Sequence, residues 1–363
     1  MSSFHFILAM SKKSKTILLC FTISSILLGS CGKNKNQLSI DDDHITISIN
    51  DYTDKTIRFS DFIARIDTIE LHTKQNFMGS ILDFCLSDSA VYIVDMTNAV
   101  WSFKYPSGEL IKRIQRTGHG NGEYISLRAI TSRDGIVYLS DIGAGKILLC
   151  DGMLNYKKSI KLDFPVLDFA KTENGFLFCN AVTTDDLNRL VYTDENGKLI
   201  NSYLPSRMEL DLLSGERTFT ENKDGDIFFN APYSNDVYKW TKYGPILAYQ
   251  TDYGEKRLEE SVKKSSEIAK SKQAYNATFF VSGNLFINSF IQNNMRYYSF
   301  CQTDSHKSLQ GFVDTTECIL FYPTAQYKDA LAGIVNTDDW DKWKPQKDSC
   351  DATLFVFHLK SCN

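Results

Sequence analysis

Short runs of alternating apolar and polar residues recur along most of the chain, and each run follows a turn sequence. Five such turns lie near residues 90, 135, 175, 225 and 283, and the runs after them read VYIVD, IVYLSD, FLFCN, IFFN and LFIN. Alternation with a period of two, bounded by turn residues, is typical of β-strands. The pattern therefore predicts a repeating chain built almost entirely of strands.

The spacing of these turns sets the size of the repeat. Successive turns are about 40 to 58 residues apart, and the first two units contain further strand candidates at 99–105, 107–114, 146–151 and 156–162. Four short antiparallel strands in a repeat of this length are typical of a β-propeller blade. We therefore predict an all-β fold, a six-bladed β-propeller of four-stranded antiparallel blades.

The blades account for residues 45–363 as one domain, with the sixth unit at 311–363. Two upstream strand candidates, 45–49 and 63–71, are expected to complete the last blade and close the ring, because closure removes open sheet edges. A two-domain β protein is the alternative.

One segment, 255–274, breaks the strand pattern. It reads EKRLEESVKKSSEIAKSKQA, with Leu258, Val262 and Ile268 at helical spacing and charges elsewhere. This spacing predicts one helical insertion, a solvated amphipathic helix on a connection between blades. The alternative is a lid over one mouth of the central channel.

The amino terminus has the pattern of a secretory signal. Three lysines precede an apolar run at 17–28, which is shorter than the roughly 20 residues of a membrane span. The next residues, LGSC, resemble the bacterial lipobox, in which the Cys, here Cys31, receives a lipid. We expect 1–30 to be a lipoprotein signal peptide, with Met10 as an alternative start, and 31–44 to be the lipidated Cys and a polar tether. The alternative is a buried helix with an incidental Cys.

These features predict a protein anchored by lipid in the outer membrane, on its periplasmic or cell-surface face. The composition, 43% hydrophobic and 23% charged, excludes a disordered chain. A net charge of −4 offers no basic face for nucleic acid.

Seven cysteines remain after Cys20 and Cys31 are set aside, and no Cys/His spacing suggests zinc. Three of them, at positions 85, 150 and 179, lie in apolar runs and are expected to be buried. A disulfide between Cys350 and Cys362 is a candidate.

A glycine-rich segment, RTGHGNGEY at 116–124, separates the first two units. Together with the opening strand at 59–71, it resembles the six-bladed β-propeller lipoproteins of Bacteroidetes, which are similar to NHL-repeat propellers. Asn121 stands where that family usually has Pro. The resemblance implies fold and envelope location, and no activity.

The candidate site residues come from this loop and from strand ends. A strand rather than a helix is expected after the loop, which argues against a phosphate loop. Instead, Arg116, His119 and Glu123 are candidates for a binding site at a channel mouth. Asp95 and Asp141 end equivalent strands in successive units and are candidates for the same mouth. A ring of Asp side chains would suit calcium, whereas the alternative role is turn capping.

Two tryptophans, Trp340 and Trp343, lie in an acidic loop and are candidates for stacking on a sugar, with loop packing as the alternative. No catalytic residue is assigned, because the His residues are scattered and no Gly-x-Ser-x-Gly motif occurs. We expect a binding or scaffold module for a glycan, a peptide or an outer-membrane partner, with no cofactor. The alternative is a propeller hydrolase or lyase with a metal in the channel.

Overall fold

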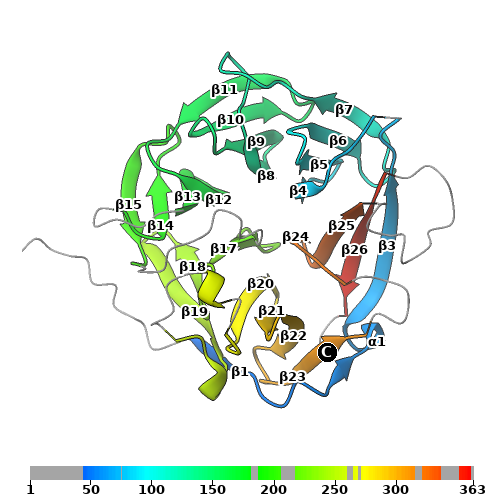
Figure 1. The fold of residues 1–363 in the computed structure, drawn as a ribbon, viewed down its shortest axis with the longest axis vertical. Helices are drawn as coiled ribbons and strands as arrows, with labels where there is room; N and C mark the ends of the chain where they lie inside the picture. Colours follow the sequence, from blue (N-terminus) through cyan, green and yellow to red (C-terminus); the bar gives the residue numbers. More distant parts are fainter. Residues whose placement is uncertain are drawn as a thin grey trace, which may run out of the picture. The chain divides into compact units, whose positions relative to one another are not determined.

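The computed structural model describes residues 44–363 except 75, 181–186, 206–216, 260–264, 269–270, 315–320, 337–350 and 361–363. The chain divides into two units, Met1–Ile40 and Asp41–Asn363. The second unit contains all the described residues, and within them the strands form six separate sheets of four or five strands (Figure 1).

Three sheets, which we call blades 1 to 3, each consist of four strands that are consecutive in the sequence. Blade 1 consists of β4 (Ile81–Leu86), β5 (Ala90–Asp95), β6 (Val100–Lys104) and β7 (Leu110–Ile114). Blade 2 consists of β8 (Leu127–Arg133), β9 (Ile136–Asp141), β10 (Lys146–Asp151) and β11 (Tyr156–Lys161). Blade 3 consists of β12 (Val166–Thr172), β13 (Gly175–Asn180), β14 (Leu190–Thr193) and β15 (Leu199–Tyr203).

The other three blades each add a strand from the amino-terminal part of the chain. Blade 4 consists of β16 (Phe219–Glu221), β17 (Ile227–Asn230), β18 (Asp236–Thr241) and β19 (Gly244–Asp252), with β1 (Ile45–Ser48). Blade 5 consists of β20 (Tyr275–Ser282), β21 (Leu285–Gln292), β22 (Met295–Gln302) and β23 (Ser308–Val313), with β2 (Thr56–Ile57). Blade 6 consists of β24 (Ala325–Tyr327), β25 (Ala330–Asn336), β26 (Ala352–Leu359) and β3 (Ile63–Leu71).

The turns recognised in the sequence lie between the first and second strands of the blades. At the turn between β8 and β9, Asp134 and Gly135 both have positive φ, 52° and 74°. Two consecutive residues with positive φ match the twist of a tight hairpin, and Asp-Gly is a preferred pair for that turn. The local sequence therefore fixes where these hairpins form.

The core is divided into six hydrophobic clusters, and each cluster lies between two neighbouring blades. Trp101 and Phe103 of blade 1, for example, pack with Leu354 and Val356 of blade 6. Because the series of clusters returns to blade 1, the ring is closed, and the predicted six-bladed β-propeller is confirmed.

Closure uses β3, which pairs antiparallel with β26 from Leu71↔Ala352 to Ile63↔Leu359 (Figure 1). The prediction that 63–71 completes the last blade is therefore confirmed. The prediction for 45–49 was wrong, because β1 instead pairs in parallel with β19 of blade 4. The predicted start of the sixth unit at 311 was also wrong, since β23 belongs to blade 5. Alternation identifies a strand but carries no information about its partner.

The few helical residues lie outside the blades. Helix α1 (Phe59–Phe62) buries both of its Phe side chains between blades 5 and 6. In the predicted helical insertion, the described helices are η1 (Gly254–Lys256) and α2 (Ser265–Ile268), and Ile268 is buried. The proposed lid role stays a prediction. None of the helices in the described ranges has the length and apolar character that a membrane crossing requires.

Candidate functional site

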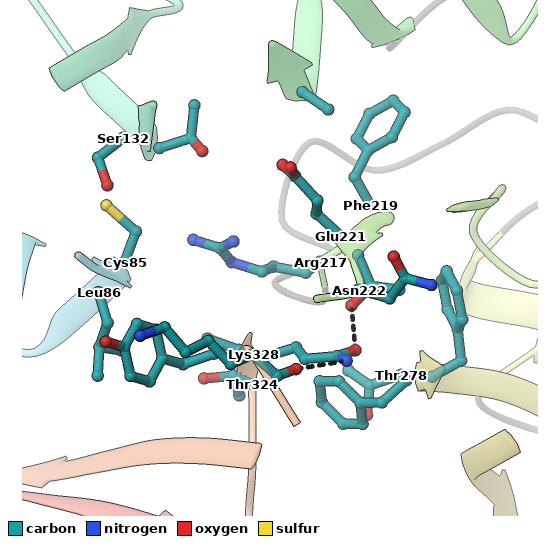
Figure 2. A pocket seen from close by; sticks show the side chains of 18 of the residues that line it. Cys85, Leu86, Ser132, Arg217, Phe219, Glu221, Asn222, Thr278, Thr324 and Lys328 are labelled. Atoms are coloured by element: carbon teal, nitrogen blue, oxygen red, sulfur yellow. Dashed lines mark hydrogen bonds between the residues drawn. The ribbon is translucent and has the colours of Figure 1, made fainter. Parts of the chain in front are cut away.

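A polar cavity of about 240 Å³ lies where the six innermost strands end. We call it the channel mouth. Every innermost strand contributes to its lining: residues 85–86 of β4, 131–132 of β8, 169–171 of β12, 219–221 of β16, 278–280 of β20 and 325–327 of β24. Lys223 also lines it, and Arg217, Asn222, Thr324 and Lys328 complete the lining (Figure 2).

Arg217 extends into the channel from the residue pair that precedes β16 (Figure 2). Its Nε donates to Asp83 Oδ1 at 2.8 Å, and its Nη2 donates to the carbonyl oxygens of Phe84 at 2.5 Å and Ile130 at 3.1 Å. Asp83 Oδ2 also accepts the backbone N–H of Ile130. One guanidinium therefore connects blade 4 to blades 1 and 2.

The charges of this pair depend on each other. Burial raises the pKa of Asp83, and the Arg217 guanidinium opposes that rise. Burial would lower the pKa of Arg217, but the carboxylates of Asp83 and Asp168 raise it above its usual value. Each charge thus favours the ionised form of its neighbour.

Two more side chains connect the remaining inner strands. Arg133 of blade 2 donates from Nη1 to the carbonyl of Lys171 in blade 3 and pairs with Glu221 of blade 4 at 3.5 Å. Gln326 of blade 6 donates from Nε2 to the carbonyl of Val281 in blade 5. Its Oε1 accepts the hydroxyl of Thr220 in blade 4 at 3.1 Å. Together with Arg217, these contacts join all six inner strands.

The charged groups that line the mouth are mainly cationic. Lysines 171, 223 and 328 line it, and Glu221 is the acidic residue among the described lining residues. Burial raises the pKa of Glu221, and Arg133 opposes the rise. The three lysines pair with carboxylates that lie outside the lining, on Glu195, Asp329 and Asp88 respectively.

Asp95 and Asp141 lie at the opposite end of the channel. Each ends the second strand of its blade and pairs with the beginning of the inner strand, as in Asp95↔Ile81. Asp95 is fully buried, and its two oxygens accept hydrogen bonds from residues 79, 97, 99 and 101. Asp141 accepts the backbone N–H groups of residues 125, 126 and 144. Both carboxylates thus organise loops.

The glycine-rich loop also lies away from the mouth, between β7 and β8. Arg116 and His119 are exposed, and Glu123 is half-buried. The Glu123 carboxylate accepts a hydrogen bond from the N–H of Gly120 at 2.7 Å. The backbone carbonyl of Glu123 accepts a hydrogen bond from Lys146 Nζ. None of the three predicted residues lines the channel mouth. Their binding role, like that of the two aspartates, stays a prediction.

The remaining predicted positions, Cys31, Trp340, Trp343, Cys350 and Cys362, lie outside the described residues. In the described part of the chain, no three His, Cys, Asp or Glu side chains gather closely enough to hold a metal ion.

The predicted burial of Cys85, Cys150 and Cys179 is confirmed, and all three are free thiols. Burial raises the pKa of the Cys85 and Cys179 thiols to about 12. Cys85 differs from the other two because it lines the channel mouth (Figure 2).

Six blades around a central channel, with an amino-terminal strand closing the ring, define a β-propeller. The sequence profile of the family described as "Domain of unknown function (DUF4934)" matches residues 44–353, so the chain belongs to that family. A comparison with curated proteins found no match.

Two solved structures share the fold. One is a protein named as exported from Bacteroides fragilis NCTC 9343, with a TM-score of 0.71 and 14% identity over 87% of this chain and 100% of that chain. The other is a member of the DUF4221 family from Bacteroides vulgatus ATCC 8482, with a TM-score of 0.53 and 8% identity over 83% of this chain and 98% of that chain.

Proposed function

We propose that this protein is a β-propeller of the cell envelope that binds a ligand, a glycan or a peptide, at the channel mouth. The observation that carries the proposal is the polar cavity to which all six inner strands contribute. Its walls are held by the contacts of Arg133, Arg217 and Gln326, so binding would require little ordering of the protein.

The size of the cavity limits the ligand. About 240 Å³ is less than the roughly 300 Å³ at which pockets for drug-sized ligands begin. The mouth therefore suits one unit of a glycan or the end of a peptide. A longer ligand would extend across the rim.

We further propose that the protein is exported and anchored in the outer membrane by a lipid on Cys31. The lipobox-like LGSC supports this, as does the name of the Bacteroides fragilis protein with the same fold. An outer-membrane protein is then a further candidate partner. The enzyme alternative, with a channel metal, has no observation in its favour among the described residues.

Thermal unfolding of the full-length protein in detergent tests the binding proposal. A ligand at 100 times its Kd should raise the stability by about 2.7 kcal/mol. The variant Thr324→Trp, which fills the mouth, should lose the shift. The control Met96→Trp should keep it, because Met96 is exposed on the loop after β5 at the opposite end.

A panel of glycans, peptides and divalent metal ions separates the outcomes. A shift that survives in Thr324→Trp would place binding elsewhere and contradict the proposal, as would a panel without any shift. A shift with calcium or zinc that a chelator abolishes would favour the enzyme alternative.

A further inference from the structure

We propose that the ligand of the channel mouth is an acidic sugar, a carboxylated and hydroxyl-rich unit. This inference rests on the proposed function and adds the ligand's chemical class. It follows from three features of the lining: where its charges lie, which neutral groups it presents, and where its phenylalanine rings lie.

The first feature is the placement of the ion pairs. Lys223 and Lys328 line the cavity, whereas their partners Asp329 and Asp88 lie outside the lining with 55% and 81% of their side chains exposed. Exposed ion pairs contribute little free energy, because water screens them. A ligand carboxylate can therefore take the place of either aspartate without leaving a buried charge unpaired.

Lys171 adds a third positive group to the wall. Its side chain is only 11% exposed, and its partner Glu195 is 64% exposed and outside the lining. Its Nζ also donates to the carbonyl of Thr172 at 2.6 Å. Arg217 attracts an anionic ligand less strongly, because the carboxylate of Asp83, at 2.8 Å, already neutralises its charge. The preference for an anion thus comes from the lysines around the rim.

The second feature is the ring of neutral hydrogen-bonding groups. Side chains of Ser132 and Thr324 lie around the cavity with the amide of Asn222, whose Oδ1 accepts the N–H groups of residues 224 and 226 (Figure 2). The Thr278 hydroxyl beside them is paired with Ser289 Oγ at 2.6 Å. Hydroxyl groups both donate and accept, so they complement the hydroxyls of a sugar in either direction.

The third feature concerns the aromatic rings. Phe169, Phe219 and Phe280 belong to the lining, yet each is less than 9% exposed because it packs between blades. These three rings are therefore not open to the side chain of a peptide, whereas the half-buried Tyr327 donates its hydroxyl to Asp88 at 2.9 Å. Hydroxyl-rich walls, cationic rim groups and buried aromatics together favour an acidic sugar over a peptide.

Calorimetric titration of the full-length protein tests the inference with paired probes. The methyl glycosides of glucuronic acid, galacturonic acid and N-acetylneuraminic acid are compared with the neutral methyl glucoside and galactoside. At least one acid should bind tenfold or more tightly than the neutral sugars at low salt, since hydrogen bonds to charged groups are the stronger ones. The advantage should shrink as salt is raised.

Two double variants test the site. Lys223→Gln with Lys328→Gln should weaken acid binding at least tenfold and leave the weak neutral binding unchanged. The control, Lys112→Gln with Lys157→Gln, removes two lysines from outer strands β7 and β11 and should change neither. Thr324→Trp should abolish both kinds of binding.

Each contrary result has a separate meaning. Equal binding of acids and neutral sugars, lost in Thr324→Trp, would overturn the charge preference and leave the proposed function standing. Tighter binding of the acidic peptide Ac-Asp-Gly-NH2 than of every sugar would overturn the sugar class. Acid binding that survives both Thr324→Trp and the first double variant would place the site elsewhere and overturn both proposals.

Discussion

At the scale of single residues, Arg217 and Asp83 form an ion pair inside the channel at 2.8 Å, with side chains 24% and 11% exposed. Such a pair contributes little net stability when intact, but removal of one partner leaves an uncompensated buried charge. Asp168 lies close enough to raise the pKa of both groups, so the loss of Arg217 would leave two carboxylates near each other.

We therefore expect Arg217→Met to lower the free energy of unfolding by about 3–5 kcal/mol at pH 7.5. The pKa of Asp83 is already raised by burial and would rise further without Arg217. A carboxyl group with a raised folded-state pKa favours the folded state below its unfolded pKa, and this stability is lost as pH rises through the folded pKa. The penalty should therefore be smaller at pH 5.

Urea unfolding at pH 5 and pH 7.5 measures the stability that Arg217→Met loses at each pH. The control is Arg58→Met, which removes an exposed arginine paired with Asp61 and should change the stability by less than about 0.5 kcal/mol. An equal penalty at pH 5 and pH 7.5 would contradict the assigned role of Asp83.

Asp95 supports a different prediction, since its carboxylate accepts five hydrogen bonds while fully buried. Asp95→Asn replaces one acceptor oxygen by an NH2 group that faces donors. We expect a loss of roughly 3 kcal/mol in thermal or urea unfolding, because hydrogen bonds to a charged group are lost.

Exposed Asp163 provides the control, and Asp163→Asn should change the stability by less than about 0.5 kcal/mol. Ligand shifts at the channel mouth should persist in Asp95→Asn. Their loss would instead support the binding role predicted for Asp95 from the sequence.

At the scale of the elements, each inner strand of a blade has one edge that faces the channel without a neighbouring strand. Buried backbone groups on such an edge need partners. Side chains supply them here: Arg217 to Phe84 and Ile130, Arg133 to Lys171, and Gln326 to Val281. The inner strands are thus fixed to one another across blade boundaries.

Gln326→Leu should therefore lower the free energy of unfolding by about 1–3 kcal/mol, because it leaves polar groups of Val281 and Thr220 without their partner. Gln310→Leu is the matched control. Gln310 also makes backbone contacts, to Ser48 and Asn50, but those two hydrogen bonds are exposed, so water can replace them. Chemical denaturation that shows equal losses for the two variants would contradict the proposed fastening of the inner strands.

At the scale of the whole molecule, stability depends on a strand that is far from its partner in sequence. β3 covers the outer edge of β26, and Leu71 is fully buried between blades 6 and 1. Without β3, that edge is open and both the blade and the cluster are incomplete.

Deletion of residues 1–72 should therefore abolish the single cooperative thermal transition and promote aggregation. Deletion of 1–43, which leaves every described strand in place, should retain the transition. Circular dichroism during heating, with light scattering, distinguishes the two outcomes. A cooperative transition in the shorter protein would show that the ring is stable without its closing strand.

Most strands, the turns and the number of blades could be predicted from the sequence. These features are local: period-two alternation places side chains on the two faces of a strand, and pairs such as Asp134-Gly135 adopt the positive φ of a tight turn. Burial of Cys85, Cys150 and Cys179 was also predictable, because each lies in an apolar run.

Which segments meet depends on the closed ring as a whole. β1 joins blade 4 rather than blade 6, and the channel mouth lies at the end opposite to Asp95 and Asp141. Arg217 contacts Asp83 across 134 residues, and Gln326 contacts Thr220 across 106. No local pattern records such pairs, because closing the ring, rather than the sequence around each residue, brings their side chains together.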